Sequence, residues 1–470
     1  MSPESSPAPA SAPSSVRPLA IILAVTFAVR LMMLPAVANM GPRISDERDY
    51  VGLAASVVDG RGYAFESGPT SLRPPLFPAL IVGTWLAGGD GRLQAVRVVH
   101  SFLAVLTAWL AYRLGRETYG QRAGLAAAAI VGLYPALLFA NLVMLSETLF
   151  TMLLLASVTM LVALMRTPLW HRALAAGLLL GLAALTRSIA WPLALVLVPF
   201  IAFATGGSLP RRLLLAAAFA VGVAAAIGPW AVRNTRLQGV PVVVDTMGGL
   251  NLRMGNYEYT PHDRIWDAVS MTGDKSWIVG LPPAPPDGGS WTEGKKDKWA
   301  RGEAVSFMLA HPVLTAWRAC IKFADFWALD RDFIAGVMRG LYDPPRWTVI
   351  VAGGALLAAY PLLLSLALTG AWLFPPDDRR IHVLLLLVIT VICGLHTIVF
   401  GHPRYRLPLT PLLAVYAGAA ITQLARHRAI DRRRLWPLAA SLVLAAGIWV
   451  VQFMVRDAAF LGRLLGGSSS

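Results

Sequence analysis

Charge is scarce in this sequence and unevenly divided between the two signs. Charged residues make up 14% of the chain and hydrophobic residues 56%, whereas a typical soluble domain carries roughly 25% charged residues. This composition excludes an ordinary soluble protein and indicates an all-α polytopic membrane protein. Only 26 residues are acidic against 41 basic ones, and in a membrane protein such an excess belongs first to cytoplasmic loops. No motif of interleaved basic and aromatic residues is evident, so we expect the lipid bilayer, and no nucleic acid, as a partner.

Cysteine is also scarce. The chain has only two cysteines, Cys320 and Cys393, and the second lies inside a hydrophobic run. This number excludes a disulfide framework, and no spacing of Cys and His typical of a metal site is present. We expect both cysteines to be packing residues.

Long hydrophobic runs, in contrast, are abundant, and about eleven of them have the ~20 residues that a membrane span needs. The expected spans are 18–38, 93–112, 123–141, 147–165, 173–187, 189–206, 213–231, 347–373, 381–400, 405–425 and 435–455. A further run, 74–88, is shorter and rich in proline, so we expect a juxtamembrane or re-entrant helix there. Residues 1–17 are rich in Ser, Pro and Ala and predict a disordered N-terminus. The spans divide into an N-terminal membrane module, 18–231, and C-terminal helices with a tail, 347–470.

The distribution of arginine predicts the orientation in the membrane. With a cytoplasmic N-terminus, the arginine-rich short loops fall inside, the densest of them at 426–434, as the positive-inside rule requires. Two long segments then lie outside, 39–92 and 232–346, and together they hold nineteen of the 26 acidic residues. We expect juxtamembrane helices in the first segment and a small region of mixed secondary structure in the second.

A short polar stretch stands out in the first outer segment. Asp46, Glu47 and Asp49 fall within four positions, and on a helix Asp46 and Tyr50 share one face. Acidic residues at a membrane boundary are costly unless they are solvated, paired or used. The pattern suggests a carboxylate base beside a cationic group, Arg73, which proline residues hold stiff. The alternative is a solvated loop whose acidic residues cap the N-terminus of a helix.

Seven motifs in order resemble the GT-C superfamily of polyprenyl-phosphate-sugar-dependent glycosyltransferases. They are Asp46-Glu47-x-x-Tyr50; Gly60-x-Gly62-Tyr63; Arg73-Pro74-Pro75-Leu76-Phe77-Pro78; Ser146-Glu147-Thr148-Leu149; Pro229-Trp230-x-x-Arg233-Asn234; Thr246-x-Gly248-Gly249-x-Asn251-Leu252-x-x-Gly255-Asn256; and Arg404-Tyr405-Arg406-Leu407-Pro408. Each motif alone is weak, but their order and spacing are similar to the bacterial branch related to protein O-mannosyltransferases and lipid A aminoarabinose transferases, glycosyltransferase family 39. The resemblance implies a GT-C fold in a bacterial inner (plasma) membrane.

The resemblance also implies a reaction, in which a sugar on a polyprenyl phosphate is transferred with inversion to a glycan, lipid or protein acceptor outside the cytoplasm. By motif, Asp46 is the general base and Glu47 a supporting carboxylate. Arg73 matches a donor-phosphate ligand and Tyr50 a site-lining tyrosine. Such a reaction needs a base for the acceptor hydroxyl and cations for the leaving phosphate. Some members use a divalent ion, but this stretch lacks the clustered carboxylates or His of a metal cage, so we favour a site without metal or cofactor.

Four further residues are candidate phosphate ligands: Arg233, Asn234, Arg404 and Arg406. The first two follow a span directly, where side chains also snorkel to the interface without any function. The last two begin a span, where they would equally serve as interfacial anchors. The competing function is a non-enzymatic polyprenyl-lipid flippase or transporter, whose polar site would lie near mid-membrane. Because the ionisable residues gather outside the spans, the sequence favours the enzyme.

Overall fold

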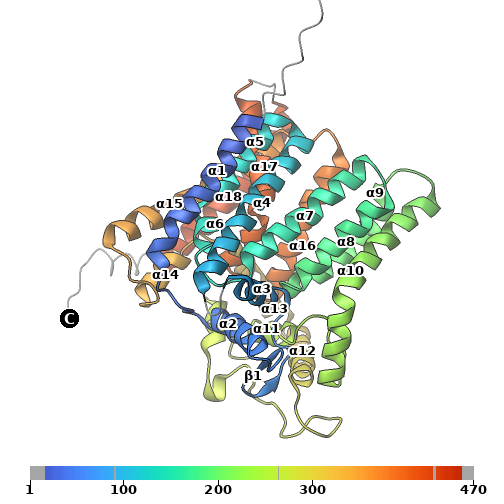
Figure 1. Ribbon diagram of the computed structural model, residues 1–470, viewed down its shortest axis with the longest axis vertical. Helices are drawn as coiled ribbons and strands as arrows, with labels where there is room; N and C mark the ends of the chain where they lie inside the picture. The colour runs from blue at the N-terminus through green and yellow to red at the C-terminus, as the bar shows by residue number, and fades with distance from the viewer. Residues whose placement is uncertain (1–15, 89–91, 263, 427–429, 458–470) are drawn as a thin grey trace, which may run out of the picture.

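The computed structural model describes residues 16–88, 92–262, 264–426 and 430–457, and most of them are arranged in helices (Figure 1). Residues 1–15 of the predicted disordered N-terminus, and the middle of the basic loop at 426–434, lie outside the described residues. The helical content confirms the prediction of an all-α polytopic membrane protein.

Within the described residues, eight helical segments are long and apolar enough to cross a membrane. Their α-helical parts are α1 (Val16–Met33), α4 (Leu93–Tyr119), α7 (Glu147–Arg166), α10 (Leu209–Gln238), α15 (Arg346–Leu373), α16 (Arg379–Ile398), α17 (Thr410–Leu424) and α18 (Leu435–Gln452). Most of α7 and α17 is buried, whereas α1 and α18 are largely exposed. The first two therefore form the centre of the bundle, and the last two lie at its periphery.

Four shorter apolar helices complete the bundle. They are α3 (Leu76–Gly88), α5 (Gln121–Leu133), α8 (Trp170–Ala184) and α9 (Trp191–Ala204). Three of them coincide with predicted spans, and α3 coincides with the predicted juxtamembrane helix. The predicted span 123–141 is divided because Pro135 starts a new helix, α6 (Pro135–Ala140), and the residue before a proline is disfavoured in a helix. The count of eleven spans stays a prediction.

Close packing of small residues brings α8 against α10, which run side by side in Figure 1. A Cβ atom at Gly177 would overlap the backbone carbonyl of Phe219, and one at Gly222 would overlap that of Leu174. Small residues at such positions let helix backbones approach closely, which is a common way of packing helices in a membrane.

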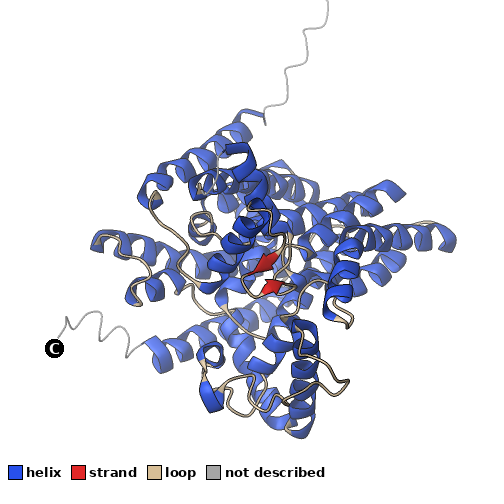
Figure 2. Cartoon of the chain, turned by 60° about the horizontal axis from the view of Figure 1, so that its bottom comes forward, coloured by secondary structure: helices blue, strands red, loops and turns tan. Residues whose placement is uncertain are grey.

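The two predicted outer segments gather at the lower end of the bundle in Figure 1. The first holds α2 (Ser45–Val58) and a small antiparallel hairpin of β1 (Ala64–Phe65) and β2 (Gly68–Pro69), drawn in red in Figure 2. The second holds α11 (Gly248–Met254), α12 (Glu293–Ala310), α13 (Pro312–Phe326) and α14 (Asp332–Met338). Its described residues form helices and turns but no strand, so the expectation of a mixed segment was wrong there. A lone extended stretch finds no partner strand in that region.

Polar contacts join the two segments. The backbone N–H of Thr246 donates to the carbonyl of Ser71 over 3.1 Å. Glu293 Oε2 accepts the N–H of Ser71 over 2.7 Å, and its Oε1 accepts the Thr70 hydroxyl over 2.6 Å. These contacts fix the loop that precedes Arg73 against both the beginning of the second segment and the start of α12.

Candidate active site

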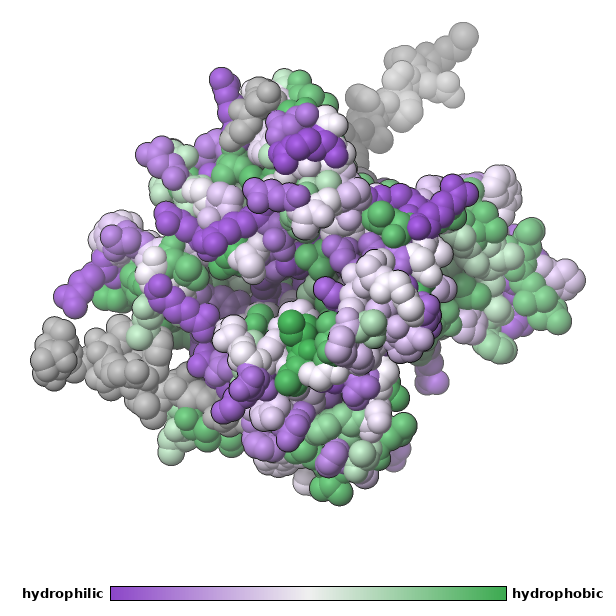
Figure 3. All heavy atoms as spheres, turned by 90° about the horizontal axis from the view of Figure 1, so that it is seen from below, coloured by the Kyte–Doolittle hydropathy of each residue, from purple (hydrophilic) through white to green (hydrophobic). Residues whose placement is uncertain are grey.

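A cavity of about 920 Å³ lies where the two segments meet the ends of the membrane helices. From below, the molecule is hollowed near its centre, and hydrophilic and hydrophobic residues alternate around the hollow (Figure 3). Four of the eight residues predicted for the site line the cavity: Asp46, Tyr50, Arg73 and Arg404. Half of the residues predicted from the sequence therefore lie at one cavity.

The start of α2 positions the first of these residues. Glu47 Oε2 accepts the backbone N–H groups of Arg43 and Ile44 over 2.8 and 3.2 Å, and Oε1 accepts the N–H of Met144 over 2.8 Å. The side chain is only 1% exposed, and it does not line the cavity. Glu47 thus caps the helix, as the structural alternative predicts, and ties it to the chain before α7. Its predicted catalytic role has no support in this geometry.

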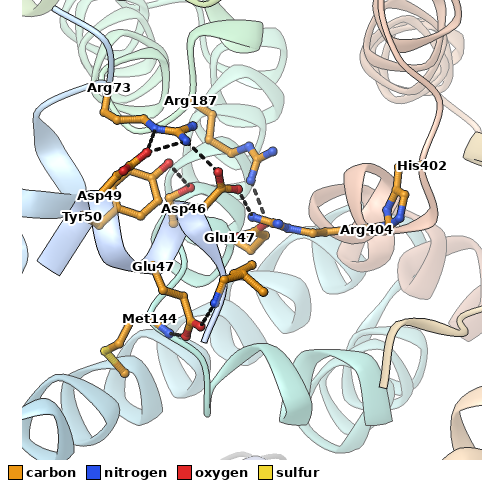
Figure 4. Close-up of polar contacts among 12 residues, drawn as sticks. Asp46, Glu47, Asp49, Tyr50, Arg73, Met144, Glu147, Arg187, His402 and Arg404 are labelled. Atoms are coloured by element: carbon orange, nitrogen blue, oxygen red, sulfur yellow. Dashed lines mark hydrogen bonds and ion pairs between the residues drawn. The ribbon is translucent and has the colours of Figure 1, made fainter. Parts of the chain in front are cut away.

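Asp46 points the other way, toward the cavity, and pairs with Arg73. Arg73 Nη2 donates to Asp46 Oδ1 over 2.7 Å and to Asp49 Oδ2 over 2.7 Å, while its Nε donates to Asp49 Oδ2 over 3.0 Å (Figure 4). Asp46 and Asp49 stand three positions apart on α2 and so share one face. The Tyr63 hydroxyl donates to the carbonyl of Arg73 over 2.9 Å, which fixes the backbone that carries the guanidinium group.

A second arginine reaches Asp46 from the far end of the chain. Arg404, in the 3-10 helix η5 (Pro403–Leu409), donates from Nη2 to Asp46 Oδ2 over 3.2 Å and from Nε to Glu147 Oε1. Glu147, the first residue of α7, also accepts Arg187 Nη1 over 2.7 Å. Glu147 is only 2% exposed, so its charge depends on these two partners.

Three arginines and three carboxylates thus form one continuous series of ion pairs, which we call the ion-pair chain. In order it contains Asp49, Arg73, Asp46, Arg404, Glu147 and Arg187. The labelled side chains of Figure 4 show it running from Asp49 and Arg73 across Asp46 to Glu147 and Arg404. Its formal charges balance, and three of its members, Asp49, Glu147 and Arg187, were not among the predicted site residues. Arg187 could have been identified from the sequence, because an arginine at the end of an apolar run is costly unless it is paired or used.

The electrostatics of the site keep its central carboxylate ionised. Burial alone would raise the pKa of Asp46, but the guanidinium groups around it, first that of Arg404 and then that of Arg73, hold the pKa below its usual value. Burial likewise raises the pKa of Tyr50, so this side chain is neutral, and its hydroxyl lies 3.5 Å from Ser146 Oγ. The site therefore combines a carboxylate anion, a neutral phenol and cationic groups.

The structure does not bring the other predicted ligands to the cavity. Arg233 donates to the carbonyls of Thr70 and Tyr63 over 2.6 and 3.2 Å, and Asn234 is fully buried. Arg406 is 3% exposed and pairs with Asp330 over 2.5 Å behind the site. Neighbouring carbonyls and carboxylates already accept hydrogen bonds from the N–H groups of these three side chains. A ligand would have to compete with these acceptors. These three residues support the site from outside the cavity and do not contact what fills it.

Within the described part of the chain, no group of three or more His, Cys, Asp or Glu side chains is placed to hold a metal ion. The two carboxylates nearest to one another on α2, Asp46 and Asp49, share Arg73. Both carboxylates are therefore already paired with a guanidinium group.

The fold and the cavity define a helical membrane protein with a charged site at the end of its bundle. Residues 72–231 match the family described as dolichyl-phosphate-mannose-protein mannosyltransferase. This match covers about a third of the chain. It includes Arg73, Glu147 and Arg187 but begins after Asp46. A comparison with curated proteins finds no significant match.

Solved structures share the architecture at low identity. The oligosaccharyltransferase of Archaeoglobus fulgidus in the apo form has a TM-score of 0.52 at 14% identity, over 92% of this chain and 54% of that one. AglB of the same organism, in complex with an inhibitory peptide and a dolichol-phosphate, has a TM-score of 0.50 at 13% identity, over 92% and 54%. ArnT from Cupriavidus metallidurans, bound to undecaprenyl phosphate, has a TM-score of 0.48 at 14% identity, over 93% and 64%.

The chain thus spans about half the length of the archaeal proteins and less than two thirds of ArnT. At such identities the likeness shows the fold alone. Together with the family match, it confirms the resemblance to the GT-C superfamily that the sequence motifs predict.

Proposed function

We propose that the protein is a membrane glycosyltransferase that moves a sugar from a polyprenyl-phosphate donor to an acceptor outside the cytoplasm, with inversion. The observation that carries this proposal is Asp46, an ionised carboxylate at the edge of a large cavity and held between two arginines. The family match to a dolichyl-phosphate-mannose-protein mannosyltransferase and the dolichol-phosphate bound to AglB support a lipid-phosphate donor.

The proposed chemistry uses the two kinds of charge separately. The acceptor hydroxyl oxygen attacks the anomeric carbon of the sugar while Asp46 takes its proton as general base. The bond between that carbon and the phosphate oxygen breaks, and its electron pair leaves with the polyprenyl phosphate. The phosphate thereby gains one negative charge, which Arg73 and Arg404 stabilise. In this scheme the arginines supply the charge that a metal would otherwise supply, so we propose a site that needs neither metal nor cofactor.

The ion pairs of the site give this scheme a specific order of events. While Arg73 and Arg404 are bound to Asp46, its carboxylate is a weak base, because both cations favour the ionised form. A donor phosphate competes with Asp46 for the same guanidinium groups. When the phosphate takes these contacts, Asp46 loses stabilisation and becomes a stronger base. Asp49 and Glu147 keep the arginines in place during the exchange.

The proposed setting is the bacterial inner membrane, with a cytoplasmic N-terminus and the cavity on the extracytoplasmic side. Segment 39–92 is then an extracytoplasmic loop within the membrane module 18–231, and 232–346 is the extracytoplasmic region between that module and 347–470. The acceptor is a glycan, a lipid or a protein that reaches the cavity from that side. A flippase is disfavoured because the charged side chains gather at the ends of helices, as for Glu147 at the start of α7.

A turnover assay with purified protein in sealed vesicles tests this proposal. Several synthetic polyprenyl-phosphate sugars, labelled on the sugar, are offered together with an extract of envelope acceptors. We expect one donor to release free polyprenyl phosphate as the label moves to an acceptor, and Asp46→Asn to abolish most of this release. Movement of intact donors across the bilayer, without release of polyprenyl phosphate, would instead establish a flippase.

A further inference from the structure

A further carboxylate, Asp245, lines the same cavity and belongs to none of the ion pairs described above. It lies in the loop between α10 and α11, and Met247, Gly248 and Asn251 after it also line the cavity. Arg73 lies near enough to lower its pKa. Asp245 therefore lines the cavity close to the Arg73 end of the ion-pair chain, without forming an ion pair with it.

The backbone on both sides of Asp245 is fixed. The carbonyl of Val244 accepts the indole N–H of Trp230 over 2.9 Å and the amide of Asn234 over 2.8 Å. On the other side, the N–H of Thr246 donates to the carbonyl of Ser71 over 3.1 Å. Ser71 stands two positions before Arg73, so Asp245 and Arg73 are held by one hydrogen-bonded scaffold. Residues on a rigid scaffold can recognise two parts of one ligand with little loss of entropy on binding.

The Asp245 carboxylate keeps capacity for a ligand. It accepts the backbone N–H of Met247 over 3.2 Å and a hydrogen bond from the Ser188 hydroxyl. An ionised carboxylate offers roughly four acceptor sites, so two contacts leave others free. Burial raises the pKa of Asp245 to about 6, and no Arg or Lys among the described residues forms an ion pair with it. A carboxylate in such surroundings gains from any hydroxyl group that enters the cavity.

We infer that Asp245 recognises the sugar of the donor, accepting hydrogen bonds from its hydroxyl groups while Arg73 binds the phosphate to which that sugar is attached. This inference rests on the proposed function and adds a specificity-determining residue to it. The ligand class is a polyhydroxylated ring joined to a phosphodiester. Ser188 and Trp191, three positions apart, line the cavity as well, and Trp191 offers an aromatic face to the carbon-bound hydrogens of such a ring.

Binding of two lipids separates recognition of the sugar from recognition of the phosphate. The probes are a polyprenyl phosphate without sugar and the same lipid carrying a hexose, chosen from a panel as the one that wild-type protein binds most tightly. We expect Asp245→Asn to bind the sugar-bearing lipid about tenfold or more weakly, since a hydrogen bond to a charged group contributes ~1.5–3 kcal/mol and each ~1.4 kcal/mol is a factor of ten. Binding of the bare lipid should be unchanged.

Three further variants make the result interpretable. Arg73→Ala should weaken both lipids, and Asp59→Asn, at an exposed carboxylate that pairs with Arg61 away from the cavity, should weaken neither. Ser188→Ala removes one hydrogen bond that orients Asp245 and should cause a smaller loss for the sugar-bearing lipid only. For Asp245→Asn, Ser188→Ala and Asp59→Asn, binding of the bare lipid at wild-type strength shows that the protein is folded.

Other outcomes would overturn the inference in distinguishable ways. Equal loss of both lipids in Asp245→Asn would mean that this residue acts through Arg73 and not on the sugar. Wild-type binding of both lipids, combined with a lower affinity for an acceptor, would assign Asp245 to the acceptor. If wild-type protein binds neither lipid, the proposed function itself fails, and the inference fails with it.

Discussion

At the scale of single residues, Asp46 and Glu47 are neighbours with opposite orientations. The side chain of Glu47 turns into the protein and accepts three backbone N–H groups, whereas Asp46 faces the cavity between two guanidinium groups. The sequence predicts that an acidic residue here is either catalytic or a helix cap. The structure gives the capping role to Glu47 and leaves Asp46 as the candidate for the catalytic role.

Replacement of Asp46 by Asn tests the catalytic half of that division. The amide keeps the size of the side chain but cannot take a proton, and general-base catalysis contributes ~10²–10⁴-fold, so turnover should fall within that range or further. Because the carboxylate no longer competes for Arg73 and Arg404, binding of polyprenyl phosphate should be at least as tight as in the wild type. Steady-state turnover and lipid affinity on one preparation provide the measurement.

The matched control is Glu47→Gln, one position further along. It weakens three hydrogen bonds to backbone groups, so thermal stability should fall, while turnover per folded molecule should fall much less than in Asp46→Asn. Near-normal turnover of Asp46→Asn would leave this stretch with a capping role alone and the base unassigned.

The pH dependence of the reaction reports on the cations around Asp46. The base acts when ionised, so kcat/KM should be constant above its pKa and decline below it. Arg404 holds this pKa down while burial raises it, so Arg404→Gln should raise the pKa and move the acid limb of the profile to higher pH. The pH at which kcat/KM declines can be measured even if the variant has a lower maximal activity. Arg48→Gln, at an exposed arginine on α2, should leave the limb in place, and a limb that moves to lower pH or stays put in Arg404→Gln would contradict this account.

The sequence predicted contacts between residues that are close along the chain but not between residues that are far apart along it. Asp46 and Arg73 were predicted together because both lie in one outer segment with matching motifs. Arg404 and Glu147 contact each other across 257 positions, and no local pattern encodes such a contact. The same limit explains Arg233 and Asn234: the sequence places them just after a span, but only the fold shows that they support the Arg73 loop from outside the cavity.

At the scale of elements, hydropathy located the helices well and their breaks less well. Length and apolar content predict a helix wherever a span was expected, and the proline-rich run 74–88 does form the separate helix α3. The run 123–141 was treated as one span, although Pro135 divides it into α5 and α6. A proline near the end of an apolar run is compatible with either a kink or a new helix, and packing against neighbouring helices decides between them.

At the scale of the whole molecule, the ion-pair chain constrains the topology. Asp46 pairs with Arg404, and Glu147 pairs with both Arg404 and Arg187, so these four points of the chain lie on one side of the bundle. Between Asp46 and Glu147 the chain passes through α4 and α5, and between Glu147 and Arg187 through α7 and α8. After Arg187 it passes through α9 and α10 and returns to the same side, where Thr246 contacts Ser71. Each of these pairs of helices is therefore a hairpin that leaves this side of the bundle and returns to it. The short helices α5 and α8 are the returning halves of their hairpins, and α9 is the outgoing half.

This pairing agrees with the charge distribution and leads to a test of orientation. If α1 enters from the cytoplasm, each hairpin returns to the outside, which places the cavity and segment 232–346 there. In a Cys320→Ser background, which removes an exposed native thiol, a single cysteine introduced by Ser290→Cys should react with a membrane-impermeant maleimide on intact spheroplasts. Ser208→Cys, between α9 and α10, should react only after permeabilisation. Both serines are exposed, so access to the thiol depends on the side of the membrane. Labelling in the reverse order would place the cavity and segment 232–346 in the cytoplasm and would reverse the direction in which α1 crosses the membrane.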